Sequence, residues 1–189
     1  MIVSLVRHAQ THIDPNLPSK NWFLTPGGQK AAQQLSQDRL WSDRDRIITS
    51  QEKKAILTAS YIAKKRNLKF ETSAKLNEVR RSGFISNYEE RVKLFFNNPS
   101  LTIDEWETAN SAQKRGIDEV NRLLSQSSST HVAIVGHGLL FSLIRAYWLK
   151  QSLVNINEWK AIRMPDVSTW RISGDDIDLM SDFKGIQLQ

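Results

Sequence analysis

Two of the four histidines, His8 and His137, lie where they could act together on a ligand. Each follows a short apolar run that is typical of a buried strand, residues 2–6 for the first and 131–135 for the second. In open α/β sheets, ligands bind beyond the carboxyl ends of the strands. We therefore expect both imidazoles at one ligand-binding edge, although either histidine alone would be interpreted as an ordinary loop or core residue.

The residues beside these histidines favour an anionic ligand. Arg7 precedes His8, and Gly136 and Gly138 flank His137. Arginine binds phosphate or carboxylate oxygens through two parallel hydrogen bonds, and glycine permits close approach of the backbone. The helix expected after residue 138 would also point its N-terminal amides at the same place. Arginine, amides and imidazoles in one place indicate an oxyanion site, with phosphate as the leading ligand.

The alternation of strands with helices predicts the architecture that positions these residues. The hydrophobic pattern indicates strands at residues 2–6, 47–49, 69–72, 131–135 and 167–173. Helices are expected from an N-cap at Thr25 to about residue 40, after a second N-cap at Ser50, and over residues 111–124 and 139–148. The order predicts an α/β fold, a three-layer α/β/α sandwich with a mostly parallel central sheet.

Residues 1–189 have the length of one domain, interrupted by a less regular segment at about residues 82–110. We expect this segment to form a short, mainly helical insertion, or cap, over the carboxyl ends of the strands. Its aromatic residues either line the mouth of the site or simply pack the insertion onto the sheet: Phe84, Tyr88, Phe95, Phe96 and Trp106.

Composition and charge exclude several classes of protein. The chain has no cysteine, so it has neither disulfides nor a thiolate nucleophile. Residues 39–81 carry 12 Lys/Arg against five Asp/Glu, which indicates an anionic partner or, as we favour, a solvated helix face. We expect no nucleic-acid partner, because no recognised binding motif accompanies the charge. No signal peptide or membrane-spanning run is evident, so we expect a cytoplasmic protein without a membrane partner.

Five short motifs together resemble those of the histidine phosphatase superfamily, also called the phosphoglycerate mutase-like family. RHAQT at residues 7–11 is similar to its RHG signature, and GHG at residues 136–138 matches the segment of its second catalytic histidine. LTPGG at 24–28 resembles the LTxxG helix start, residues 49–59 resemble the SxxxxRA segment, and LNE at 76–78 resembles LxE. The motifs follow the family order over about residues 1–150, and the length suits the small phosphatase branch.

This resemblance implies a mechanism that proceeds through a phosphohistidine. His8, as a neutral imidazole, would attack phosphorus, and water would then release phosphate. A backbone carbonyl holding the other ring N–H would fix the tautomer. Arg7 would bind the phosphoryl oxygens, and a protonated His137 would offset charge that develops in the transition state. No metal or other cofactor is required, because fixed cations supply the charge.

Glu78 would be the general acid that protonates the departing alcohol oxygen. Partial burial under the insertion would favour the protonated carboxyl that this role requires. The alternative is a surface carboxylate paired with Arg80 or Arg81.

The chain departs from the family pattern at three places. Lys54 stands where the family carries a second arginine, and it cannot make two parallel hydrogen bonds; Arg80 or Arg81 is the alternative. Ala9 replaces a glycine, and Asp14 stands where an asparagine is usual, unless Asn16 is its counterpart. On this reading the catalytic residues are His8, Arg7, Glu78 and His137, and the substrate-binding residues are Lys54, Thr11, Asp14, Asn16, Thr25 and Gly138.

The sequence therefore favours a metal-independent phosphomonoesterase of the histidine acid phosphatase type. Its substrate would be a small phosphorylated metabolite, with a phosphoprotein as the second choice. A phosphoglycerate mutase proper is less favoured, because its insertions are usually longer than this chain can hold. The alternative function is a catalytically weak or inactive module of the same fold that binds phosphate or a phosphoprotein, as the changes at Lys54 and Asp14 suggest.

Overall fold

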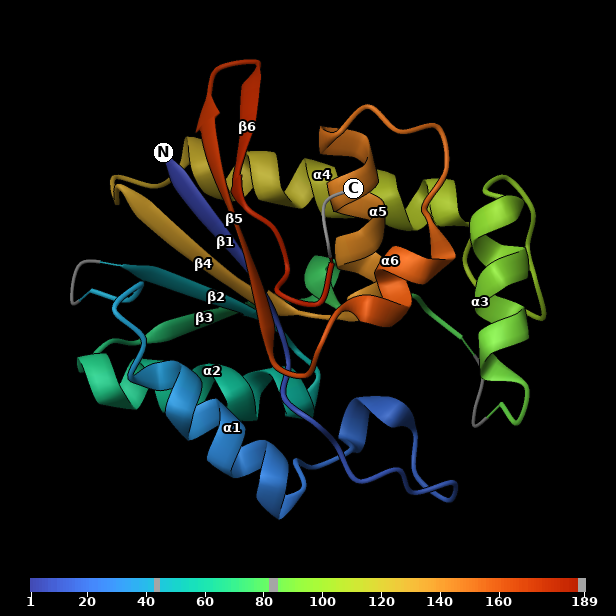
Figure 1. The fold of residues 1–189 in the computed structure, drawn as a ribbon, viewed down its shortest axis with the longest axis horizontal. Coiled ribbons are helices and arrows are strands. Elements are labelled where there is room, and N and C mark those ends of the chain that lie inside the picture. Colours follow the sequence, from blue (N-terminus) through green and yellow to red (C-terminus); the bar gives the residue numbers. More distant parts are fainter. Residues whose placement is uncertain (43–44, 82–84, 187–189) are drawn as a thin grey trace.

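A six-stranded sheet forms the centre of the computed structural model, which describes residues 1–42, 45–81 and 85–186. Its strand order is β3-β2-β4-β1-β5-β6 (Figure 1). The first four strands run parallel, and β5 and β6 each pair antiparallel with their neighbours. The strands are β1 (Ile2–Arg7), β2 (Arg46–Ser50), β3 (Phe70–Ser73), β4 (His131–Gly136), β5 (Asp166–Ser173) and β6 (Asp176–Ser181).

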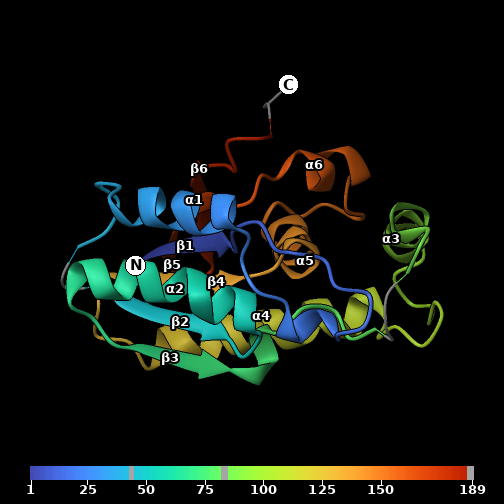
Figure 2. The same ribbon diagram turned by 90° about the horizontal axis from the view of Figure 1, so that it is seen from below.

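Helices cover both faces of this sheet, as Figures 1 and 2 show. Helices α1 (Pro26–Ser36) and α2 (Lys53–Arg66) lie on one face, and α4 (Ala109–Ser125) and α5 (Gly138–Trp148) lie on the other. The predicted three-layer α/β/α sandwich with a mostly parallel sheet is thereby confirmed. The remaining helices are α3 (Tyr88–Asn97), α6 (Ile156–Ala161) and two short 3₁₀ turns, Ser19–Asn21 and Ala74–Leu76.

The alternation of side chains along β1 explains how the layers are joined. Val3 and Leu5 belong to the cluster under α4 and α5, whereas Val6 belongs to the cluster under α2. Successive side chains of a strand point to opposite faces, so a strand covered by helices on both sides is apolar throughout. Burial on both faces is the physical origin of the apolar runs that reveal β1 and β4 in the sequence.

Helix α1 begins where the sequence predicts and ends earlier. The Thr25 hydroxyl accepts a hydrogen bond from the Gly28 amide at 2.9 Å, as expected of an N-cap. The helix stops at Ser36 and not near residue 40, because the chain turns so that the buried Trp41 indole donates to the Leu35 carbonyl at 2.8 Å.

The predicted N-cap of α2 is wrong. Ser50 is the last residue of β2, and Glu52 occupies the N-cap position of the helix. The Ser50 hydroxyl lies 2.7 Å from the ring Nε2 of His137, so this side chain is used at the edge of the sheet instead.

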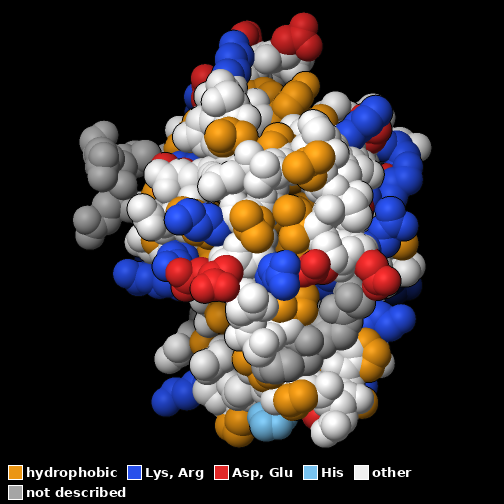
Figure 3. All heavy atoms as spheres, turned by 90° about the vertical axis from the view of Figure 1, so that its right-hand side faces the viewer, with side chains coloured by type: hydrophobic (Ala, Val, Ile, Leu, Met, Phe, Trp, Pro, Cys, Tyr) orange, Lys and Arg blue, Asp and Glu red, His pale blue; other side chains and the backbone are white. Residues whose placement is uncertain are grey.

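The expected insertion contains α3, which packs against the first turns of α5, the start of α4 and helix α6. Phe95, Phe96 and Trp106 are buried in this cluster, so they serve packing and not the mouth of a site. Tyr88 is half-buried, and Phe84 lies outside the described residues. Helix α6 was not predicted. Figure 3 shows the side of the molecule that carries α3, where acidic and basic side chains lie together among exposed apolar ones.

The strand β6 is fastened to the sandwich by a buried ion pair. Arg145 of α5 donates to Asp182 through Nε and Nη2 and to Glu158 through Nη1. Both Arg145 and Asp182 are almost wholly buried. Within the described residues, no helix is both long enough and apolar enough to cross a bilayer.

Replacing Arg145 by methionine is expected to lower the free energy of unfolding by about 3 kcal/mol or more, because it leaves the Asp182 carboxylate buried without its partner. Urea denaturation of the variant and the parent protein measures this difference. The matched control is Lys114→Met, which breaks an exposed ion pair with Asp118 and should cost less than about 1 kcal/mol. Equal effects of the two substitutions would contradict the structural role of Arg145.

Candidate active site

The register of two neighbouring strands brings the predicted histidines together. Arg7 of β1 pairs with Gly136 of β4, and the His8 amide donates to the Gly136 carbonyl at 2.9 Å. The residues that follow, His8 and His137, therefore leave the sheet side by side. Their ring centroids are 5.3 Å apart with an angle of 61° between the planes. One tetrahedral anion can contact both rings at hydrogen-bonding distances of about 2.7–3.2 Å.

A backbone carbonyl orients the imidazole of His8. Its Nδ1 lies 2.8 Å from the Ala9 carbonyl oxygen. A carbonyl only accepts, so Nδ1 carries the hydrogen, and Nε2 of the neutral ring keeps a free lone pair. Burial, followed by the charges of His137 and Lys54, lowers the pKa of His8 well below the usual value for histidine. The ring therefore remains neutral, with the tautomer that a nucleophilic Nε2 requires.

His137 is fully buried, and its two ring nitrogens differ in their surroundings. Nε2 lies 2.7 Å from the Ser50 hydroxyl and 3.8 Å from Oε1 of Glu52, while Nδ1 has no hydrogen-bond partner. Burial first, and then the charges of Lys54 and Arg81, lowers the pKa of His137 well below its usual value. The protonated His137 expected from the sequence is therefore not the form that the pocket favours by itself. A phosphoryl dianion beside the ring would favour protonation, because an opposite charge stabilises the imidazolium.

The guanidinium of Arg7 lies directly against the first residue of α5. A side chain at Gly138 would place its Cβ only 2.9 Å from Cζ of Arg7, so glycine is required for this contact. Arg7 donates from Nη1 to the Ile162 carbonyl, and its buried Nε has no partner in the described part of the chain. Burial lowers the pKa of Arg7, and the carboxylate of Glu78 opposes this effect. The site thus holds a cation with an unused donor.

Glu78 is buried, and its carboxylate caps helix α5. Its oxygens accept hydrogen bonds from the amides of Leu139 at 3.1 Å and Leu140 at 3.0 Å. The expectation that these helix amides face the anion is therefore wrong, because Glu78 occupies them. Nor does Glu78 form the alternative surface pair with Arg80, whose partner is Glu107. Hydrogen bonds from helix amides favour the charged carboxylate, so the partial burial expected to favour the protonated form is opposed here.

Lys54 is buried at the predicted place but is paired with a carboxylate that the sequence reasoning missed. Its Nζ donates to Oε2 of Glu52 at 2.5 Å and to the Ser19 carbonyl at 2.8 Å. Oε1 of Glu52 accepts the Glu78 amide at 2.8 Å, so Glu52 links two strand-end segments. The signal was present, because Glu52 follows the end of β2 just as His8 and His137 follow the ends of their strands.

Four predicted substrate-binding residues make other contacts. Asp14 Oδ1 accepts the Asn16 amide at 2.9 Å in a local turn, and Asn16 is exposed. The Thr25 hydroxyl caps α1, and Thr11 is held by a backbone bridge to Leu24. Within the described residues, none of these four side chains makes a contact with His8 or His137.

Tyr88 of α3 extends the site toward the insertion. Its ring centroid lies 5.9 Å from that of Trp106 and 6.0 Å from that of Trp159. Burial raises the pKa of Tyr88 to about 12, with smaller opposing effects that include the charge of Arg81 and the carboxylate of Glu78. The phenol therefore stays protonated close to the charged groups of the pocket.

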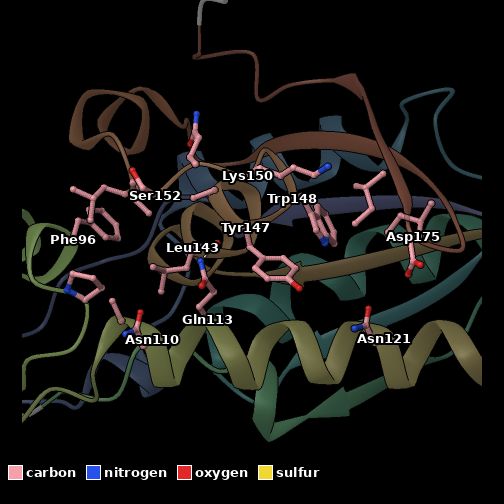
Figure 4. Close-up of a pocket in the computed structure, with 18 of the residues that line it drawn as sticks. Phe96, Asn110, Gln113, Asn121, Leu143, Tyr147, Trp148, Lys150, Ser152 and Asp175 are labelled. Carbon is pink, nitrogen blue, oxygen red and sulfur yellow. Dashed lines mark hydrogen bonds between the residues drawn. The ribbon is translucent and has the colours of Figure 1, made fainter.

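A separate cleft of about 840 Å³ lies between α4, α5 and the β5–β6 hairpin. Figure 4 shows Tyr147 and Trp148 of α5 above Asn110, Gln113 and Asn121 of α4 in this cleft. None of the site residues predicted from the sequence lines it. Among the described residues, no group of three or more His, Asp or Glu side chains is arranged to hold a metal ion.

Paired imidazoles and an arginine at the carboxyl edge of a mostly parallel sheet place the chain in the class of α/β proteins that bind an oxyanion at the strand ends. The family model described as histidine phosphatase superfamily (branch 1) matches residues 3–181. The chain belongs to this superfamily. No sequence among the curated proteins matches it.

Solved structures with the same fold include several phosphatases. The protein YhfR of Bacillus stearothermophilus has a TM-score of 0.79 at 17% identity, with 96% of each chain covered. The α-ribazole phosphatase of Shigella flexneri has a TM-score of 0.73 at 22% identity, with all of both chains covered. Phosphoserine phosphatase of Entamoeba histolytica, solved with 3-phosphoglyceric acid, has a TM-score of 0.73 at 19% identity, with 96% of this chain and 95% of that chain covered.

Acidification is expected to destabilise the protein through its two buried imidazoles. Both pKa values are lowered on folding, so below about pH 6.5 the unfolded chain binds protons that the folded protein does not. The free energy of unfolding should then fall by up to about 1.4 kcal/mol per pH unit for each histidine. Urea denaturation between pH 7.5 and 5 measures the slope, and His137→Asn should reduce it. An unchanged slope in this variant would contradict the assignment.

Proposed function

We propose that the protein is a phosphomonoesterase that acts on a small phosphorylated metabolite through a phosphohistidine. The observation that carries the proposal is the orientation of His8, whose Nε2 is free while Nδ1 is held by the Ala9 carbonyl, 5.3 Å between ring centroids from a second buried histidine. A neutral, oriented imidazole is a nucleophile, and its neighbours are cations that suit a phosphoryl group.

The reaction takes two steps. The lone pair of Nε2 attacks phosphorus, the bond from phosphorus to the alcohol oxygen breaks, and the leaving oxygen takes a proton from Glu78. Water then attacks phosphorus, the P–N bond breaks, and inorganic phosphate leaves as Nε2 regains its lone pair. Glu78, now a carboxylate, accepts the proton of that water, which returns both groups to their starting states.

The charges of the pocket act on the transferring group. Arg7 has an unused buried Nε, and His137 has an unpartnered Nδ1 that becomes a donor. Both suit the equatorial oxygens of a phosphoryl group, where charge is stabilised most effectively in a site from which water is excluded. Entry of the dianion also favours protonation of the nearby Glu78, because like charges disfavour the carboxylate. Substrate binding thus prepares both the acid and the second histidine.

The neighbours support the class of substrate. The structures of similar fold are named as phosphatases of α-ribazole phosphate, glucosyl-3-phosphoglycerate and phosphoserine. All of these are small phosphorylated molecules. Metal independence is part of the proposal, since Arg7, Lys54 and a protonated His137 would supply the positive charge.

The pairing of Lys54 with Glu52 favours a second candidate, a module that binds phosphate with little turnover. A carboxylate at 2.5 Å from the Lys54 ammonium reduces the net positive charge of the pocket. The hydrogen bonds to Glu78 also hold the carboxylate in its charged form, which is unsuited to a general acid.

Incubation with an aryl phosphate and excess chelator is expected to give turnover that disappears in His8→Ala, because the alanine cannot attack phosphorus. Acid-stable phosphate esters are excluded by showing that the labelled intermediate is lost in acid and kept in base, as a phosphohistidine is. Turnover unchanged in the variant would contradict the nucleophile. Tight phosphate binding by calorimetry without turnover would support the binding module.

Substitution of Glu78 by glutamine is expected to lower kcat by about 10²- to 10⁴-fold for an alkyl phosphate, because the alkoxide then leaves without a proton. For an aryl phosphate the loss should be much smaller, since a phenolate leaves readily unprotonated. The ratio of the two rates is the measurement, and it separates acid catalysis from general damage to the site. Equal losses for both substrates would contradict the role of Glu78.

A further inference from the structure

The cation that stands at the family's second arginine position is already satisfied. Lys54 donates to Glu52 and to the Ser19 carbonyl, and both Lys54 and Glu52 are buried. A buried ion pair of this kind is costly to separate, because either charge left alone would be poorly solvated. Lys54 therefore contributes little free charge to a ligand.

Arg81 is a different kind of cation, because it lies against aromatic rings and has no acidic partner in the described part of the chain. Its guanidinium carbon lies 4.9 Å from the ring centroid of Tyr88 and 5.7 Å from that of Trp106. Its Nη1 is buried and makes no hydrogen bond. Buried donors are almost always paired, so an unpaired guanidinium nitrogen indicates a partner supplied by a ligand.

The neighbouring Arg80 shows the contrast. Its side chain is exposed, and it lies 3.7 Å from the carboxylate of Glu107. Stacking on Tyr88 and Trp106 instead keeps the plane of Arg81 fixed while leaving its edge available for hydrogen bonds.

The position of Arg81 within the pocket is on the side of the insertion. Its charge acts on His137 and on Tyr88, whereas the cations that act most strongly on His8 are Lys54 and Arg7. In the proposed reaction, the alcohol part of the substrate leaves on the side opposite His8, because attacking and leaving atoms are in line with phosphorus. Arg81 thus lies nearer to the leaving group than to the nucleophile.

We propose that Arg81 is a specificity-determining residue that binds a carboxylate on the alcohol part of the substrate. A guanidinium held flat against two rings offers parallel donors that match the geometry of a carboxylate. The inference rests on the proposed phosphatase function and adds to it a class of substrate, phosphomonoesters whose leaving alcohol carries an acidic group.

Two substrates that differ at one carbon test this inference. In 3-phosphoglycerate that carbon is a carboxylate, and in glycerol 3-phosphate it is a neutral hydroxymethyl group. Arg81→Ala is expected to lower kcat/KM for 3-phosphoglycerate by about 10- to 100-fold. It should leave kcat/KM for glycerol 3-phosphate nearly unchanged. Arg80→Ala is the matched control and should change neither value.

The pattern of losses decides the outcome. An equal loss for both substrates would assign Arg81 to the phosphoryl group, and no loss for either would leave it without a role in binding; both results overturn the inference. Arg81→Lys should recover only part of the preference, because lysine keeps the charge without the parallel donors.

Binding separates this inference from the proposed function. If the parent protein hydrolyses neither substrate, the phosphatase proposal fails, and calorimetry with the same two compounds still tests Arg81. Tighter binding of 3-phosphoglycerate that is lost in Arg81→Ala and kept in Arg80→Ala supports the carboxylate site. Equal affinity for the two compounds in the parent protein overturns it. Thermal denaturation of each variant checks that the fold is intact.

Discussion

The parallel pairing of β1 with β4 is the constraint on which the site depends. Because Arg7 and Gly136 are partners in this register, the next residues emerge from the sheet next to each other. A shift of one residue would move every side chain of the strand to the opposite face and would separate the two imidazoles. The apolar cores on both faces hold the register, so packing energy far from the pocket is what positions His8 against His137.

Compensation among buried charges then decides which groups remain available. Lys54 is matched by Glu52, and Glu78 is matched by the amides at the start of α5. The groups left with unpaired nitrogens are Arg7, Arg81 and His137. Unpaired buried nitrogens are costly, so their presence in one pocket is most simply understood as preparation for an anion.

Features that depend on neighbouring residues in the chain could be predicted, whereas side-chain partners could not. The N-cap at Thr25 and the strand ends before His8 and His137 follow from local chemistry, and they are found where expected. Ser50 fits the sequence rule for an N-cap equally well, yet its hydroxyl bonds to a histidine 87 positions away in the chain. Periodicity contains no information about such a partner, because competition from distant groups outweighs a cap worth only about 1 kcal/mol.

The sequence by itself determined the layered α/β architecture and the edge at which the histidines lie, because burial on both faces leaves apolar runs and parallel strands end at a common edge. Only the tertiary structure decided the charge state and use of the groups at that edge. The neutral form of His137, the pairing of Glu52 with Lys54 and the unpaired nitrogen of Arg81 all arise from desolvation and from charges brought close by folding. Those distances are set by packing between segments far apart in the chain.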